Sequence, residues 1–135
     1  MTQIILFPAI AGLVAVVTVL YLATKDDYLK KSLWVVPAFF SILFLALSLQ
    51  TVFAEGPLGF WPEHTRNLWG NQIWYDLLLA AVAALFFAIP QAKSVGMRVI
   101  PWSLLVLTTG SMGLYAFIAR LLYLKSRQSD CNGGI

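Results

Sequence analysis

Residues 72–92 read QIWYDLLLAAVAALFFAIPQA and contain a single charged side chain, Asp76. A helix of this length matches the ~30 Å hydrocarbon layer of a bilayer. Three further apolar runs are similarly long, at residues 4–23, 32–53 and 101–124. Backbone N–H and C=O groups find no partners in lipid, so such runs form helices. The sequence predicts an all-α integral membrane protein, a bundle of four antiparallel transmembrane helices.

The composition of the whole chain agrees with this class. Of its 135 residues, 60% are hydrophobic and 11% are charged, whereas soluble domains carry about 25% charged residues. This excludes an ordinary soluble domain and a disordered chain. The net charge of +3 comes from Lys and Arg near the ends of the apolar runs. Without a basic stripe, no nucleic-acid partner is expected. The expected partners are the lipid bilayer and other membrane-protein subunits or further copies of the chain.

The four runs predict one transmembrane domain, residues 1–125, followed by a polar tail, residues 126–135. Two connections are short, at residues 24–31 and 93–100. The third connection, residues 54–71 (AEGPLGFWPEHTRNLWGN), is longer and rich in Trp, Pro and Gly. Trp favours the headgroup layer, so this segment is expected to be an interfacial loop. The first apolar run has no preceding Lys or Arg and is too long for a secretory signal, so a retained transmembrane helix is expected.

An even number of spans predicts that both termini lie on the side that carries residues 54–71. The opposite side then holds the larger number of basic residues, namely Lys25, Lys30, Lys31, Lys93 and Arg98. By the positive-inside rule this opposite side is expected to be cytoplasmic, with both termini outside. A multi-pass protein of a bacterial inner membrane is the expected location. The single cysteine, Cys131, allows no internal disulfide.

Two charged residues lie inside predicted helices at similar depth. Counted from Gly96, Asp76 is 20 positions away and Arg120 is 24 positions away, so their depths differ by about 6 Å. The helical face of Asp76 also carries Gln72, Ala80, Ala83 and Ala84, and that of Arg120 carries Thr109, Gly113 and Ala116. Small residues let membrane helices approach closely. The sequence predicts that the third and fourth helices pack along these faces with Asp76 and Arg120 paired, as a structural pair or a functional anchor.

Polar and aromatic residues collect on the side of residues 54–71. They predict a vestibule for an amphiphile that is apolar inside and polar at its mouth. The candidate ligand-binding residues are Gln50, Gln72, Trp74, Tyr75 and Arg120. His64 is the only histidine, and its spacing from Glu55 and Glu63 does not suit a metal ion. No metal site is therefore predicted, and no cofactor is identified.

Three short motifs carry a family resemblance. Residues 74–80 (WYDLLLA) open a helix with Asp76 ahead of an Ala/Leu run, residues 94–98 (SVGMR) form a basic-flanked glycine turn, and residues 121–127 (LLYLKSR) form an aromatic and basic helix exit. With these motifs, residues 71–127 resemble a family of small bacterial membrane proteins of unassigned function, the "2834" domain of unknown function. The resemblance implies that Asp76 corresponds to the family's Asp, and it implies no activity.

The chain is also similar, more faintly, to membrane-embedded terpene and carotenoid cyclases or isomerases. These are small helical proteins that protonate an olefin or epoxide with an intramembrane carboxyl group. The similarity implies Asp76 as the general acid, Glu55 or Glu63 as the second carboxylate, and Trp74 and Tyr75 as aromatic walls for a carbocation. A paired arginine at Asp76 would argue against this role.

Three functions follow from these observations, and the sequence does not decide whether the chain is an enzyme. The first is a subunit or scaffold of a membrane complex, or a binder of a lipophilic cofactor. The second is an isoprenoid cyclase or isomerase with Asp76 as its acid. The third is a small oligomeric transporter, although the first apolar run lacks the carboxylate on which four-helix multidrug exporters depend.

Overall fold

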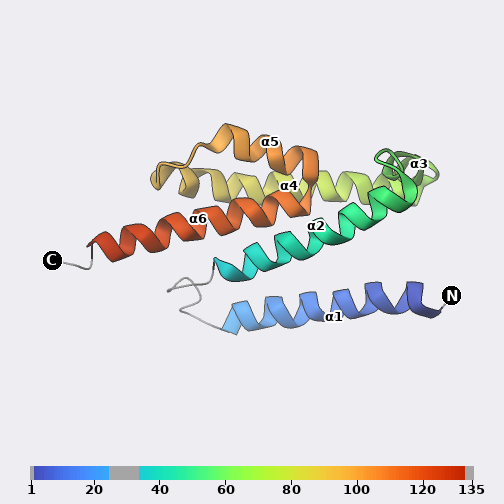
Figure 1. Cartoon of the computed structure of the whole chain (residues 1–135), viewed down its shortest axis with the longest axis horizontal. Helices are drawn as coiled ribbons and strands as arrows, with labels where there is room; N and C mark the ends of the chain where they lie inside the picture. Colours follow the sequence, from blue (N-terminus) through green and yellow to red (C-terminus); the bar gives the residue numbers. More distant parts are fainter. Residues whose placement is uncertain (1, 25–33, 133–135) are drawn as a thin grey trace. The chain divides into compact units, whose positions relative to one another are not determined.

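A computed structural model describes residues 2–24 and 34–132, without the side chains of residues 2–9, 22 and 130–132. All regular structure in these ranges is helical (Figure 1). The predicted all-α class is therefore confirmed. The chain forms two compact units, which are described separately below.

The first unit, Met1–Lys30, contains helix α1 (Thr2–Thr24). This helix confirms the one predicted for residues 4–23, and its described segment Ile10–Tyr21 is apolar. The hydroxyl of Thr18 donates a hydrogen bond to a carbonyl oxygen one turn earlier, so this polar group is satisfied within the helix. The basic residues that the sequence placed after this helix, Lys25, Lys30 and Lys31, lie outside the described residues.

The second unit, Lys31–Ile135, contains the remaining helices. These are α2 (Val35–Glu55), α3 (Phe60–Thr65), α4 (Leu68–Ser94), α5 (Val99–Thr109) and α6 (Ser111–Asn132). In the part of the chain that the structure describes, α2 and α4 are the two helices long and apolar enough to cross a membrane. They correspond to the predicted helices at residues 32–53 and 72–92. The segment 54–71 is not a simple loop, because it holds α3 and the first turn of α4. The predicted tail is likewise helical as far as Asn132.

The prediction of one continuous helix at residues 101–124 is wrong, because the chain reverses at Gly110. Its φ of 63° and ψ of −130° suit glycine, which has no Cβ to clash. The Gly110 N–H donates to the Val106 carbonyl oxygen at 2.7 Å and ends α5. Helices α5 and α6 then approach closely at Gly113, where a Cβ would lie 2.7 Å from the Leu105 carbonyl oxygen. Helix α5 is only ~16 Å long, about half of a hydrocarbon layer.

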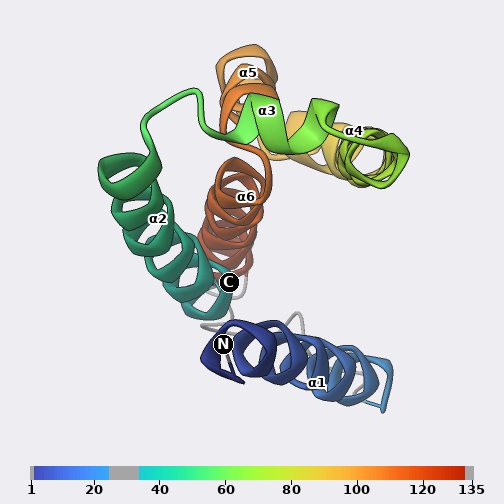
Figure 2. The same cartoon turned by 90° about the vertical axis from the view of Figure 1, so that its right-hand side faces the viewer.

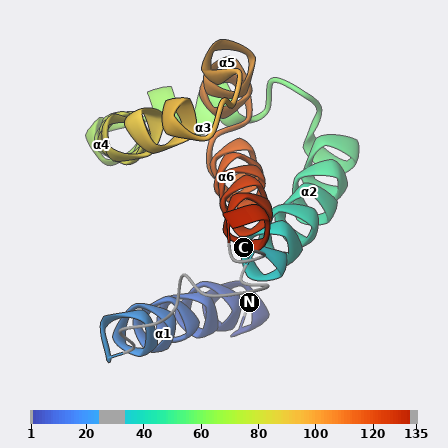
Figure 3. The same ribbon diagram turned by 90° about the vertical axis from the view of Figure 1, so that its left-hand side faces the viewer.

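Helix α6 lies at the centre of the second unit. End-on views place it between α2 on one side and α5 and α4 on the other (Figures 2 and 3). Helices α2 and α6 run antiparallel: the rings of Trp34 and Tyr123 are 5.5 Å apart near one end, and the Ser41 hydroxyl donates to the Met112 carbonyl oxygen at 3.0 Å near the middle. Over the described residues, α2 and α4 do not contact each other.

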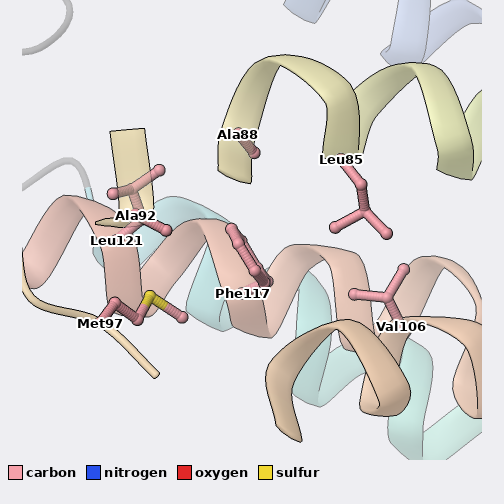
Figure 4. Close-up of a cluster of buried hydrophobic side chains, with 7 residues drawn as sticks. All are labelled: Leu85, Ala88, Ala92, Met97, Val106, Phe117 and Leu121. Atoms are coloured by element: carbon pink, nitrogen blue, oxygen red, sulfur yellow. The ribbon is translucent and has the colours of Figure 1, made fainter. Parts of the chain in front are cut away.

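The hydrophobic core lies between α4, α5 and α6. Its buried residues are Leu85, Ala88, Ala92, Met97, Val106, Phe117 and Leu121 (Figure 4). Helix α4 thus packs through the face of Leu85, whereas Asp76, Ala80 and Ala83 on the predicted face are exposed. The predicted packing along the small-residue faces is wrong. Large side chains such as Leu85 and Phe117 make more van der Waals contacts between the helices than alanines do, which makes this face the better contact.

Because the chain reverses at Gly110, the C-terminal ends of α4 and α6 lie at the same end of this unit (Figure 1). One end, here named the basic end, holds Lys93, Arg98, Arg120, Lys125 and Arg127. The other, here named the acidic end, holds Glu55, Glu63 and Asp76 together with Arg66. The sequence predicted that the C-terminal end of the last helix shares a side with residues 54–71. The structure corrects this, since α6 ends at the basic end and residues 54–71 lie at the acidic end.

Candidate functional site

Asp76 and Arg120 do not meet in the structure. The Lys125 ammonium donates to the Gln91 side-chain oxygen at 2.6 Å, so these residues of α6 and α4 lie at similar levels. Arg120 therefore lies roughly ten residues, or ~15 Å, along α4 from Asp76. The predicted pair is wrong because the depth count assumed a continuous helix. The reversal at Gly110 instead carries Arg120 back to the basic end.

At the acidic end, an aromatic corner joins α3 to α4. The Trp74 ring stacks on Phe60 at 6.0 Å and meets the edge of His64 at 5.1 Å. Helix α4 is capped by Asn67, whose side-chain oxygen accepts from the Gly70 N–H at 2.8 Å. Trp74, a predicted ligand-binding residue, is half-buried in this corner.

The three candidate carboxylates do not form a cluster. Glu55 ends α2, and Asp76 lies on α4. Glu63 of α3 pairs at 3.5 Å with Arg66, which follows that helix. All three carboxylates are exposed. Asp76 borders a shallow depression of about 280 Å³ whose walls come from α4 alone: Trp69, Gln72, Ile73, Tyr75, Asp76 and Leu79. Three of the predicted site residues, Gln72, Tyr75 and Asp76, are thus brought together. Among the described side chains, no three His, Cys, Asp or Glu residues are grouped to hold a metal ion.

Gln50, the remaining candidate at this end, is exposed on α2. Helix α2 does not contact α4 within the described ranges. The predicted vestibule would need Gln50 and the α4 residues to share one surface, and the structure provides no such surface.

A larger hollow lies between α2, α5 and α6, toward the basic end. We name it the α2–α6 groove. Its volume is about 410 Å³, and it is an open surface groove, not an enclosed pocket. Its lining comprises three aromatic residues, four small ones, one isoleucine and one arginine: Trp34, Trp102, Tyr123, Ala38, Ser41, Ala116, Ala119, Ile42 and Arg120.

The groove exists because small residues face each other across the two helices. Ala38 and Ser41 on α2 oppose Ala116 and Ala119 on α6, so the backbones stay close while little side-chain volume fills the space. The Ser41 hydroxyl bonds to the α6 backbone at 3.0 Å and fixes the inner part of the groove. The outer part is lined by the rings of Trp34 and Tyr123, which meet edge to face with their centroids 5.5 Å apart.

Arg120 is the one cation of the groove lining. Its guanidinium carbon lies 5.7 Å from the centre of the Tyr123 ring, a distance that permits a cation–π interaction. No carboxylate of the described residues lies within ion-pair distance of Arg120. Lys125, one turn further along α6, is by contrast engaged with Gln91. The groove therefore combines apolar walls with a positive charge that remains available to a ligand.

The sequence identified Arg120 as a ligand residue but gave it the wrong neighbours. Trp34 and Trp102 were missed, although each stands near the beginning of an apolar run, where Trp favours the membrane interface. The predicted topology already placed the beginnings of these two runs on one side of the membrane. What the reversal at Gly110 adds is Arg120 and Tyr123, which α6 brings to the same end.

No family model matches the chain, and neither a curated protein nor a solved structure matches it. The resemblances to the "2834" family and to the membrane-embedded cyclases stay predictions.

Proposed function

We propose that this chain is an integral membrane protein. Helices α2 and α4 have the length and hydropathy that a membrane span requires. Pro37 is the one buried residue of α2, and large apolar side chains such as Phe53 and Phe86 are 86% and 73% exposed. A helix in the core of a soluble protein buries its apolar stripe against neighbouring elements. Lipid supplies the apolar surroundings that the protein itself does not give these side chains.

In the proposed topology, α2 and α4 cross the membrane, and the α5–α6 hairpin enters from the basic end and returns to it. Backbone polar groups at membrane depth need partners within the protein. Gly110 is exposed, but its N–H donates to the Val106 carbonyl oxygen and its own carbonyl oxygen accepts from the Leu114 N–H. The basic end carries five Lys and Arg residues, against one at the acidic end, within the described residues. The positive-inside rule then assigns the basic end to the cytoplasm. The C-terminal end of α6 is accordingly cytoplasmic, opposite to the sequence-based expectation.

Within this topology, the function that the geometry supports best is binding of a lipophilic ligand in the α2–α6 groove. The observation that carries the proposal is the available charge of Arg120 at the edge of a hollow with apolar walls. Nothing in the geometry favours the cyclase, because its carboxylates are exposed and separate. Assembly with other subunits and oligomeric transport stay predictions.

Native mass spectrometry of the protein, extracted from its own membrane in mild detergent, tests this proposal. We expect a bound mass of small-molecule size that is released on denaturation. Ala116→Trp fills the groove and should abolish the bound mass. Ala83→Trp adds the same volume on an exposed face of α4 and should retain it. A ligand that persists in Ala116→Trp would show that the groove is not its site, and a bound polypeptide in place of a small molecule would favour the subunit function.

A further inference from the structure

We infer that the ligand of the α2–α6 groove is an anionic phospholipid, drawn from the leaflet at the basic end. This inference rests on the proposed function and specifies its ligand. The lipid phosphate lies at Arg120, and one acyl chain follows the apolar walls between α2 and α6.

The length of the groove restricts the ligand to one leaflet. Its α2 wall extends from Trp34 to Ile42, a distance of ~12 Å along the helix, which is less than half of the ~30 Å hydrocarbon layer. Trp34 and Tyr123 stand at the outer part, and such amphipathic rings favour the level of lipid headgroups. Ala38, Ile42 and Ala116 line the deeper part with apolar groups. The outer part of the groove thus suits a lipid headgroup, and its deeper part suits an acyl chain.

The charges identify the headgroup as anionic. A guanidinium group can form two parallel hydrogen bonds to a phosphate, and no carboxylate of the described part of the chain neutralises Arg120. The groove lies toward the basic end, and clusters of Lys and Arg at a cytoplasmic membrane surface attract anionic lipids. A neutral isoprenoid would use the apolar walls but gain nothing from the guanidinium group. A zwitterionic lipid carries the same phosphate, but its ammonium group cancels the charge. The net negative charge of the headgroup is therefore the feature that Arg120 selects.

Two substitutions separate a direct phosphate contact from general attraction. Arg120→Gln and Lys125→Gln each remove one positive charge from the same end, but only Arg120 lines the groove. The purified, delipidated protein is titrated with dioleoyl phosphatidylglycerol or dioleoyl phosphatidylcholine, which have equal acyl chains, and binding is measured by native mass spectrometry. Phosphatidylglycerol should bind the unchanged protein at least about 10-fold more tightly than phosphatidylcholine. Arg120→Gln should weaken phosphatidylglycerol binding by about 30-fold or more, and Lys125→Gln by about 5-fold or less.

Equal binding of the two lipids, or equal losses in the two variants, would overturn the inference. Inorganic phosphate in excess should leave phosphatidylglycerol bound. Displacement by phosphate would instead show a site for the free anion. Ala116→Trp separates this inference from the function on which it rests. A ligand that is lost in Ala116→Trp but unaffected by Arg120→Gln would keep the groove as a lipophilic site and reject the anionic headgroup. A ligand unaffected by both changes would reject both.

Discussion

Replacing Gly110 by alanine tests the helix reversal on which the topology depends. The added Cβ meets no atom within 4 Å, so the substitution creates no steric overlap with neighbouring elements. What it changes is the backbone preference at a φ of 63° and ψ of −130°, which L-residues with a side chain rarely adopt. The expected effect therefore comes from local conformation alone.

The sign of the effect distinguishes the two possible structures of residues 101–124. In the α5–α6 hairpin, holding alanine in the conformation of Gly110 should lower the free energy of unfolding by about 1–3 kcal/mol. In a continuous helix, alanine would be the better residue and would raise the free energy of unfolding by about 1 kcal/mol. The two structures thus predict changes of opposite direction.

Reversible unfolding in detergent micelles, titrated with SDS and followed by circular dichroism, gives the required free energies. Gly12→Ala in α1 is the control, because its Cβ would also meet open space but its φ is not positive. The control should be stabilised by up to about 1 kcal/mol. A Gly110→Ala protein as stable as the control would refute the hairpin and restore the continuous fourth helix.

Two further predictions concern topology and packing. Single cysteines are introduced at Ser94, Ser129 and Glu63 in a background without the native cysteine. The cysteines at positions 94 and 129 should react with an impermeant thiol reagent from the cytoplasmic face, and the one at position 63 from the opposite face. Reaction of positions 129 and 63 from the same face would contradict the reversal. Ser41→Ala should lower the free energy of unfolding by about 1 kcal/mol because it removes the hydrogen bond between α2 and α6. Thr51→Ala, whose hydroxyl bonds within its own helix, should cost less, and equal losses would show that the α2–α6 bond contributes nothing.

Much of the helical architecture could be predicted from hydropathy. The apolar runs at residues 32–53 and 72–92 correspond to α2 and α4, and the turn predicted at Gly96 is present with a φ of 71°. The run at residues 101–124 misled the prediction because its hydropathy continues across Gly110. A single glycine inside an apolar helix costs only ~1 kcal/mol. Gly110 by itself therefore did not indicate that the chain reverses.

The predicted pairing of Asp76 with Arg120 was wrong for the same reason. Periodicity correctly placed Gln72 and Asp76 on one face of a helix, and Gln72, Tyr75 and Asp76 do border one depression. The partner of that face could not be deduced, since the direction of α6 depends on the conformation of one glycine. Once α6 runs back toward the basic end, Arg120 faces α2 and the small residues beside it form a groove wall. Local sequence patterns fix which residues share a face, but not what that face meets.

The short length of α5 has a consequence for the lipid around the protein. Because α5 and α6 meet near the level of Ser41, residues 31–135 place α2, α4, α5 and α6 side by side at the basic end, but only α2 and α4 continue along the rest of the span. In the proposed orientation, this part of the chain displaces more lipid from the cytoplasmic leaflet than from the opposite one. Such a difference in cross-sectional area acts as a wedge. The energy of inserting this unit should then depend on the curvature of the membrane and should favour regions where the cytoplasmic leaflet is the expanded one.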